Sequence, residues 1–263
     1  MSGGQDEQVL RELSAAVQNG EPVVLATVVA TRRSVPRHAG TKMLVYQDGR
    51  LTGTVGGGEM ESRVIEEARA AFGTRRPQLL DYTLLEPARG DPGVCGGEVQ
   101  IYLEPYMPAH TILVIGGGHV GRAVVDLADW LGYRTIVVDD RPERMTEAEM
   151  PNAGERRVGS ITDVLGDLDV IEDTSVVVVT RSVDKDAEAI PLLLKTPARY
   201  IGVMGSERRW REVKAKLAQV GLDDADLERV QTPIGIDIHA ETLEEIAVSI
   251  LSEIIRLRGA SEG

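Results

Sequence analysis

The 263-residue sequence contains one cysteine, 3% aromatic residues and no apolar run as long as the ~18 residues of a membrane span. The single thiol, Cys95, excludes an internal disulfide framework and a cysteine-rich zinc site. Residues 1–10 are polar and acidic, unlike the apolar core of a signal peptide. We therefore expect a cytoplasmic protein without a metal site of its own.

Positive charge is also scarce, because 29 basic residues face 42 acidic ones and the formal net charge is -13. Binding to nucleic acid or to anionic lipid needs a basic face, so the composition argues against both partners. Residues 1–106 carry 14 acids and 11 bases, whereas residues 107–263 carry 28 acids and 18 bases. An anionic ligand therefore needs a local cluster of cations, which the first part can build more easily.

A linker at residues 105–108 predicts two domains, 1–106 and 107–263. In the first, apolar spacing predicts helices at 9–17 and 59–72, strands at 22–30, 78–85 and 99–103, and a hairpin of 43–46 and 51–55. In the second, strands at 111–115, 135–138, 176–179 and 200–204 alternate with helices at 119–131, 206–220 and 242–258. The acidic stretch 163–173 is expected to be an exposed connection. The alternation predicts a parallel sheet in an α/β protein.

A glycine-rich loop opens the second domain. Gly116, Gly118 and Gly121 fit the pattern G-x-G-x-x-G between a predicted strand and a predicted helix. The first glycine permits a tight turn, the second lets the backbone approach a phosphate, and the third lets the helix pack on the strand. Asp139 ends the next strand, where an acid binds a ribose and disfavours a 2'-phosphate. We expect a Rossmann-like domain that binds a nucleotide or pterin nucleotide, or one that has lost its ligand.

Two further residues of this domain have alternative roles. His119 contacts a phosphate or substrate, or it caps the helix that follows the loop. Ser206 contributes to an anion site at a helix N-terminus, or it is an ordinary N-cap. No residue pair typical of hydride-transfer acid-base chemistry stands out, which counts against an ordinary dehydrogenase.

Residues 31–42 form a predicted loop that is rich in cations and free of acids. Arginine guanidinium groups suit phosphates and oxo-anions, so the loop is either an anion site or a solvated basic loop. Its basic residues are Arg32, Arg33, Arg37, His38 and Lys42.

Two glycine-acid turns complete the candidates. Gly56, Gly57 and Gly58 precede a helix whose first turn contains Glu59 and Glu61. These carboxylates either favour the helix start or bind a donor-rich heterocycle such as a pterin, or a metal centre. Cys95 precedes Gly96 and Gly97, and it is a soft metal ligand, a sulfur carrier or a small buried residue.

Several segments in order resemble the XdhC/CoxI family of xanthine dehydrogenase accessory factors. The match covers roughly residues 30–258. It is carried by S-V-P-R and A-G-T-K-M-L-V within 34–45, G-T-V-G-G-G at 53–58 with Glu61, C-G-G-E-V at 95–99, L-E-P at 103–105, G-G-G-H-V-G at 116–121, D-D-R-P-E at 139–143, and the segments 200–206 and 233–238.

The resemblance implies an accessory factor that binds molybdenum cofactor, supports its sulfuration and inserts it into an apo molybdenum hydroxylase such as xanthine or carbon monoxide dehydrogenase. It also suggests a homodimer. Many relatives carry cysteine or histidine where Glu59 stands, so a thiolate is unavailable there. Cysteine-based sulfur handling must use Cys95 or a partner such as a cysteine desulfurase.

The cofactor is expected as molybdopterin or its dinucleotide form, with an NAD-type nucleotide as a further ligand of the glycine loop. The residues expected to bind are Arg32, Arg33, Arg37, Lys42, Gly56, Gly57, Gly58, Glu59, Glu61, Cys95, Gly116, Gly118, His119, Gly121, Asp139 and Ser206. A non-catalytic chaperone is favoured. The alternatives are an NAD-dependent oxidoreductase and a nucleotide-sensing interaction module without catalysis.

Overall fold

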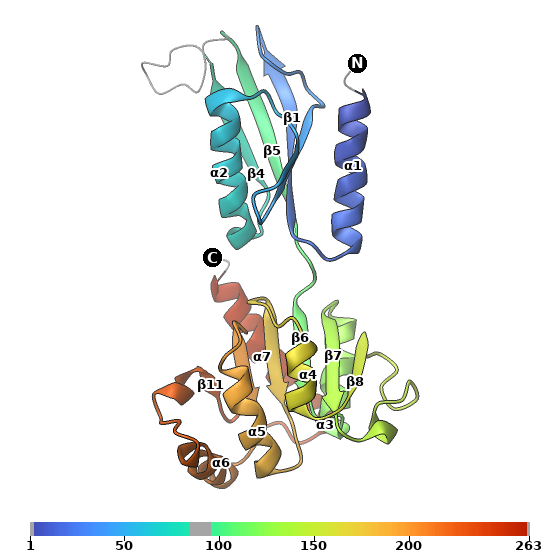
Figure 1. Cartoon of the computed structure of the whole chain (residues 1–263), viewed down its shortest axis with the longest axis vertical. Coiled ribbons are helices and arrows are strands. Elements are labelled where there is room, and N and C mark those ends of the chain that lie inside the picture. Colours follow the sequence, from blue (N-terminus) through green and yellow to red (C-terminus); the bar gives the residue numbers. More distant parts are fainter. Residues whose placement is uncertain (1–2, 85–95, 262–263) are drawn as a thin grey trace. The chain divides into compact units, whose positions relative to one another are not determined.

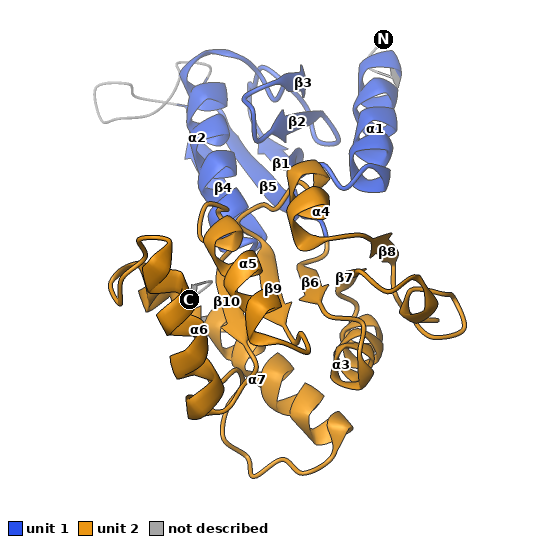
Figure 2. Cartoon of the chain, turned by 60° about the horizontal axis from the view of Figure 1, so that its bottom comes forward, with its two compact units in different colours: residues 1–108, 262–263 blue, residues 109–261 orange. Residues whose placement is uncertain are grey.

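The computed structural model describes residues 3–84 and 96–261. The chain divides into two compact units, which are coloured separately in Figure 2. Unit 1 extends from the N-terminus to Pro108, and unit 2 covers Ala109–Ser261. Each unit has hydrophobic clusters formed from its own residues. Among the helices of the described part, none combines the length and the apolar character needed to cross a membrane.

Unit 1 is an antiparallel sheet between two helices (Figure 1). Its strand order is β3-β2-β1-β5-β4, and its elements are α1 (Gly3–Gln18), β1 (Val23–Arg32), β2 (Lys42–Tyr46), β3 (Leu51–Gly53), α2 (Gly58–Thr74), β4 (Gln78–Thr83) and β5 (Glu98–Tyr106). Side chains alternate across β1, so Val24 and Ala26 pack in the cluster that contains α2, whereas Val23 and Leu25 pack in the cluster that contains α1. Burial of both faces explains the continuous apolar run of this strand.

Unit 2 is a parallel six-stranded sheet with the order β11-β10-β9-β6-β7-β8. Helices α3 and α7 cover one face, and α4, α5 and α6 cover the other. The elements are β6 (Thr111–Ile115), α3 (His119–Trp130), β7 (Arg134–Asp139), β8 (Glu155–Val158), α4 (Ile161–Asp167), β9 (Thr174–Val178), α5 (Val183–Leu193), β10 (Tyr200–Val203), α6 (Glu207–Gln219), β11 (Val230–Gln231) and α7 (Leu243–Ser261), with short 3-10 turns at Pro142–Arg144 and Asp226–Arg229. The parallel α/β architecture and the N-terminal α+β part predicted from the sequence are confirmed.

One local expectation is wrong. The acidic stretch 163–173 is not simply an exposed connection, because its first residues belong to α4 and Val164 and Val170 are buried in the core of unit 2. The charged residues of this segment alternate with apolar ones that pack inward, so a short helix forms where charge alone suggests a loop. The strand β8 and the helix α5 also lie outside the predicted elements.

Candidate functional site

A cleft of about 410 Å³ lies at the carboxyl ends of the central strands of unit 2. We call it the loop cleft; it is lined by residues that follow β6, β7 and β9, by the start of α3 and by parts of α4, α5 and α7. The chain proceeds from β6 to β7 on one side and returns to β9 on the other, so the cleft lies where the strand order reverses. Open α/β sheets bind ligands at this position.

The glycine loop forms the centre of the loop cleft. Gly116 has φ 120°, and a Cβ there would lie 2.5 Å from the Val179 carbonyl oxygen. At Gly121 a Cβ would lie 2.0 Å from the Gly116 carbonyl oxygen, so both positions require glycine for packing. At Gly118, which precedes α3, a Cβ would meet no atom of the described residues within 4 Å. Gly118 therefore leaves open space in front of the N-terminal amides of α3.

Asp139 lies in the loop cleft at the end of β7 and is 8% exposed. Its Oδ2 accepts hydrogen bonds from the Gly117 N–H (2.7 Å) and from an Arg141 guanidinium nitrogen (2.8 Å). Its Oδ1 accepts from the Arg141 N–H (2.9 Å) and Nε (2.8 Å). Burial raises the pKa of Asp139, but these hydrogen bonds outweigh burial and hold the pKa at about 2. A ribose that reached this carboxylate would compete with Arg141.

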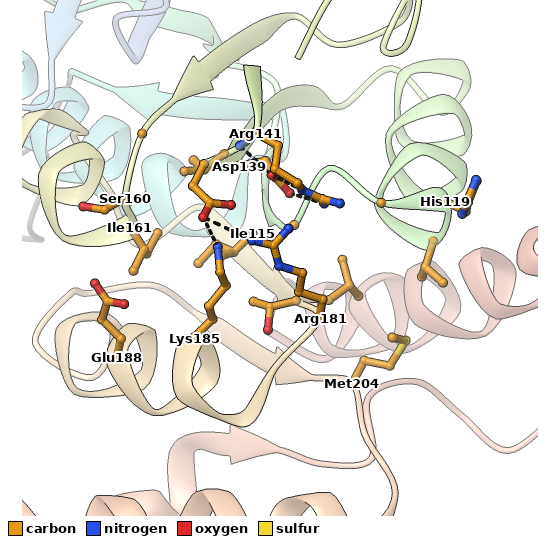
Figure 3. Close-up of a pocket in the computed structure, with 18 of the residues that line it drawn as sticks. Ile115, His119, Asp139, Arg141, Ser160, Ile161, Arg181, Lys185, Glu188 and Met204 are labelled. Atoms are coloured by element: carbon orange, nitrogen blue, oxygen red, sulfur yellow. Dashed lines mark hydrogen bonds and ion pairs between the residues drawn. The ribbon is translucent and has the colours of Figure 1, made fainter. Parts of the chain in front are cut away.

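A second group of charges lies beside Asp139. Asp140 forms ion pairs with Lys185 (2.5 Å) and Arg181 (3.4 Å), which come from the α5 side of the cleft. Figure 3 shows Arg141, Arg181 and Lys185 gathered near Asp139, with His119 and Met204 at the opposite side of the view. One end of the cleft is therefore charged, whereas the end near Met204 is lined by Val120 and Leu243.

The structure separates the two residues with alternative roles. His119 is exposed and lines the loop cleft at the start of α3. Ser206 lines a neighbouring cavity of about 580 Å³ and caps α6, because its Oγ accepts a hydrogen bond from the Arg209 N–H (3.3 Å). Met204 lines both hollows, so the cavity with Ser206 adjoins the loop cleft.

In unit 1 the basic loop lies exposed between β1 and β2. Arg32 approaches Glu98 at 3.6 Å, and the Lys42 Nζ donates to the Gly40 carbonyl oxygen (2.9 Å). Within residues 3–84 and 96–261, Arg33 and Arg37 have neither an ion-pair nor a hydrogen-bond partner. These two guanidinium groups are therefore available to an anion.

The glycine turn before α2 is organised by Glu61. The Glu61 Oε2 accepts hydrogen bonds from the Val55 and Gly57 N–H groups (both 3.1 Å) and from the Thr54 hydroxyl. Gly56, Gly57 and Gly58 all have positive φ, and a Cβ at Gly56 would lie 2.9 Å from Pro36 of the basic loop. The turn and the loop are thus packed together.

The two acids of this turn have different environments. Glu59 is exposed and pairs with Arg63 one turn further along α2 (2.6 Å), whereas Glu61 is half-buried. Gly97 packs against the Ser34 and Arg32 carbonyl oxygens, which brings the start of β5 to the same edge. Cys95 lies outside the described residues.

Sequence reasoning missed the cations and the hydroxyl of the loop cleft. Arg141 was visible two residues after Asp139, and Thr180 and Arg181 directly follow the predicted strand 176–179. Because carboxyl ends of parallel strands share one edge of a sheet, residues directly after each predicted strand were the available signal. Lys185 carries no such signal, since it enters the cleft from the first turn of an unpredicted helix.

The sequence matches two family profiles. The XdhC Rossmann domain covers residues 112–254, and the XdhC and CoxI family profile covers residues 16–83.

Three curated proteins are similar to this chain. It is 30% identical to YqeB of Escherichia coli K12 over 97% of this chain and 47% of YqeB. It is 23% identical to the molybdenum cofactor insertion chaperone PaoD of the same strain, over 95% of this chain and 88% of PaoD. It is 27% identical to a probable xanthine dehydrogenase protein of Bacillus subtilis 168, over 60% of this chain and 46% of that protein. The chain thus spans about half the length of two of these relatives and most of PaoD.

A solved structure named as a xanthine dehydrogenase from Bacillus halodurans shares the fold. It aligns with a TM-score of 0.53 at 23% identity, over 97% of this chain and 96% of that chain. Because the two family profiles lie in order along the sequence and the Rossmann profile alone matches residues 112–254, the chain belongs to the XdhC and CoxI family.

Proposed function

We propose that this protein binds molybdenum cofactor as cargo and inserts it into an apo molybdenum hydroxylase. The observation that carries the proposal is the similarity to the insertion chaperone PaoD along 95% of this chain. Xanthine dehydrogenase and carbon monoxide dehydrogenase are the acceptor enzymes that we propose first. The chain acts in the cytoplasm, as a homodimer, and does not itself catalyse a hydride transfer.

The loop cleft supports this role because the cargo carries a phosphate. The space in front of Gly118 is open, and the first amides of α3 face a position where a phosphate oxygen can accept their hydrogen bonds. A molybdopterin phosphate or the pyrophosphate of a dinucleotide form fits this chemistry. Arg181 and Lys185 at the charged end would contact the nucleotide of the longer form.

The basic loop supports a second anion contact. Arg33 and Arg37 are exposed and have no partner among the described side chains, and guanidinium forks suit oxo-anions. In this proposal Glu61 acts on the cargo only indirectly, because its carboxylate holds the amides of the glycine turn. Lys42, Glu59 and Arg32 lie near the same edge of unit 1 and complete its polar surface.

Support of sulfuration is the finer part of the proposal. Cys95 is the chain's single thiol, so sulfur would come from Cys95 or from a cysteine desulfurase that docks beside it. Cys95→Ser should leave cofactor binding unchanged. If the thiol carries sulfur, the variant should deliver a desulfo cofactor, which cyanide-treated hydroxylase serves to calibrate.

An NAD-dependent oxidoreductase is the second candidate, and the glycine loop is the observation that favours it. Mass spectrometry of small molecules that purify with the protein under anaerobic conditions separates the two. The chaperone proposal predicts molybdopterin or its dinucleotide in the wild type and less of it in Gly118→Val. That substitution fills the open space while keeping an extended backbone, since Gly118 has φ -82°. Recovery of NAD(H) alone would contradict the proposal.

A further inference from the structure

The cavity that adjoins the loop cleft has a different chemical character. It measures about 580 Å³ and lies beyond the carboxyl end of β10, on the other side of Met204. We call it the isoleucine cavity, because its walls are mainly apolar. Its apolar side chains are Met204, Pro233, Ile234, Ile236, Ile238 and Ile246. Such walls favour a flat, weakly charged group over a phosphate.

The wall of this cavity is held in place by hydrogen bonds to buried groups. The Glu253 carboxylate is buried, and its Oε2 accepts from the Gly235 N–H (2.8 Å) and from the Tyr200 hydroxyl (2.5 Å). Burial, together with the neighbouring Glu253, raises the pKa of Tyr200 far above its ordinary value, so the hydroxyl remains a donor. The Ser249 Oγ also donates to the Ile236 carbonyl oxygen (2.6 Å). The segment that carries the isoleucines is therefore preformed.

Gly235 shows how closely this wall packs. It has φ 92°, and a Cβ there would lie 2.3 Å from the Ser249 Oγ. The backbone of the wall thus lies directly on α7, and its isoleucine side chains are left to line the cavity. A rigid wall costs little ordering when a planar ligand enters.

The rim of the isoleucine cavity supplies hydrogen-bond acceptors. Asp237 lines the cavity, and its side chain is 85% exposed with Oδ1 accepting from the His239 N–H (3.1 Å). A carboxylate has capacity for several donors. The amino-pyrimidinone edge of a pterin presents adjacent N–H donors, which a carboxylate at a rim can accept together.

The position of the cavity matches one end of a two-part ligand. The loop cleft lies over β6, β7 and β9, and the isoleucine cavity continues over β10. Ligands of doubly wound sheets extend across the point where the strand order reverses, with their phosphates at the glycine loop. A ligand bound in this way would place one end among Asp139, Arg181 and Lys185, and its other end beyond Met204.

We propose that the isoleucine cavity binds the flat pterin ring of the cargo, while the loop cleft binds its phosphate or nucleotide end. This inference rests on the proposed function. Isoleucine side chains would contact the ring faces, and Asp237 would accept hydrogen bonds from the amino-pyrimidinone edge. The cavity holds the ring and contributes no hydride chemistry.

Titration of the full chain with 6-hydroxymethylpterin, followed by pterin fluorescence, tests the assignment. Ile236→Trp fills the cavity, and Ile238→Trp narrows it from a position that is 41% exposed and therefore tolerant of a larger side chain. Both should weaken pterin binding by about tenfold or more. Asp237→Asn should weaken it by about tenfold through loss of a charged acceptor. Inorganic pyrophosphate, as a probe of the loop cleft, should bind all variants like the wild type.

Ile255→Trp is the matched control, because Ile255 is 40% exposed on α7 and lies outside the lining of the cavity. Unchanged pterin affinity in both cavity variants would overturn the assignment, and so would failure of the wild type to bind the probe. Weakening of NADH binding without weakening of pterin binding would assign the cavity to a nicotinamide ring instead. Intact molybdenum cofactor keeps the two proposals apart: equal binding by the wild type and both cavity variants would leave the proposed function standing and remove only the ring site.

Discussion

The acids that the sequence offers as ligand contacts are, in this fold, already engaged by the protein. Asp139 accepts four hydrogen bonds from Gly117 and Arg141, and Glu61 accepts three around the glycine turn of unit 1. Residue type and spacing identify these positions correctly as special. They do not reveal whether a carboxylate faces a ligand or the backbone, because that depends on where Arg141 and the Gly57 amide lie in space.

Asp139→Asn should lower the free energy of unfolding by about 2 kcal/mol near neutral pH. The folded-state pKa of about 2 lies below the unfolded value, so the carboxylate stabilises the fold above the unfolded pKa and this contribution is lost as pH falls toward 2. The difference between wild type and variant should therefore shrink by about 1 kcal/mol from pH 6 to pH 3 in urea titrations. The more exposed Asp140→Asn is the control, and a pH-independent Asp139 effect would refute the explanation.

Glu61→Ala should destabilise the protein by about 2 kcal/mol, since it leaves the Val55 and Gly57 amides without their acceptor. Glu61→Gln keeps an acceptor oxygen and should cost about half as much. Glu59→Ala removes only an exposed pair with Arg63 and should change stability by less than about 0.5 kcal/mol. Chemical denaturation of the three variants checks this order. Equal effects at Glu59 and Glu61 would mean that Glu61 does not organise the turn.

At the scale of elements, long apolar patterns are predictable and short charged ones are not. The segments β1, β6 and α3 follow from buried runs and helical spacing. In contrast, β8 consists of Glu155–Val158 and lies at a sheet edge, so its pairing with β7 depends on tertiary contact rather than on its own pattern. The helix α5 contains Pro191, which argues against a helix in sequence terms.

The candidate site was predictable only in part for the same reason. The glycine loop has a local signature, and the structure gives each glycine a distinct packing environment. The charged end of the loop cleft joins Asp140 to Arg181 and Lys185 through the crossover from β8 to β9. No spacing along the chain encodes such a contact.

The three glycines of the loop should respond differently to alanine. Gly121→Ala places a methyl group 2.0 Å from the Gly116 carbonyl oxygen and should destabilise unit 2 by about 2 kcal/mol or more. Gly118→Ala meets open space and should change stability by less than about 1 kcal/mol while weakening pyrophosphate binding. Thermal unfolding and calorimetric titration distinguish these outcomes. Destabilisation by Gly118→Ala to the same extent as Gly121→Ala would contradict the proposed division of roles.

At the scale of the whole molecule, the chain combines two units with separate cores and unequal charge. The clusters of unit 1 draw on residues up to Met107, and those of unit 2 begin at Ile112. The acidic excess lies mainly after residue 106, whereas the unpartnered arginines of the described basic loop, Arg33 and Arg37, lie in unit 1. The net charge of -13 therefore opposes a coating polyanion but allows one compact anion at a local cluster.

Separate cores predict separable unfolding. Differential scanning calorimetry of the intact protein should resolve two transitions, with Glu61→Ala moving only one of them and Asp139→Asn only the other. If both substitutions shift a single transition, the two units unfold as one cooperative structure.

Transfer of molybdenum cofactor to an acceptor in trans tests the central claim most directly. The purified protein is loaded with cofactor under anaerobic conditions, separated from free cofactor and mixed with apo-xanthine dehydrogenase, whose activity is then followed. We predict activation by the wild type and activation about tenfold weaker with Gly118→Val or with the pair Arg33→Ala and Arg37→Ala, since each change removes an anion contact. A wild-type protein that retains no cofactor, or an apo-enzyme that gains equal activity from free cofactor alone, would contradict the account.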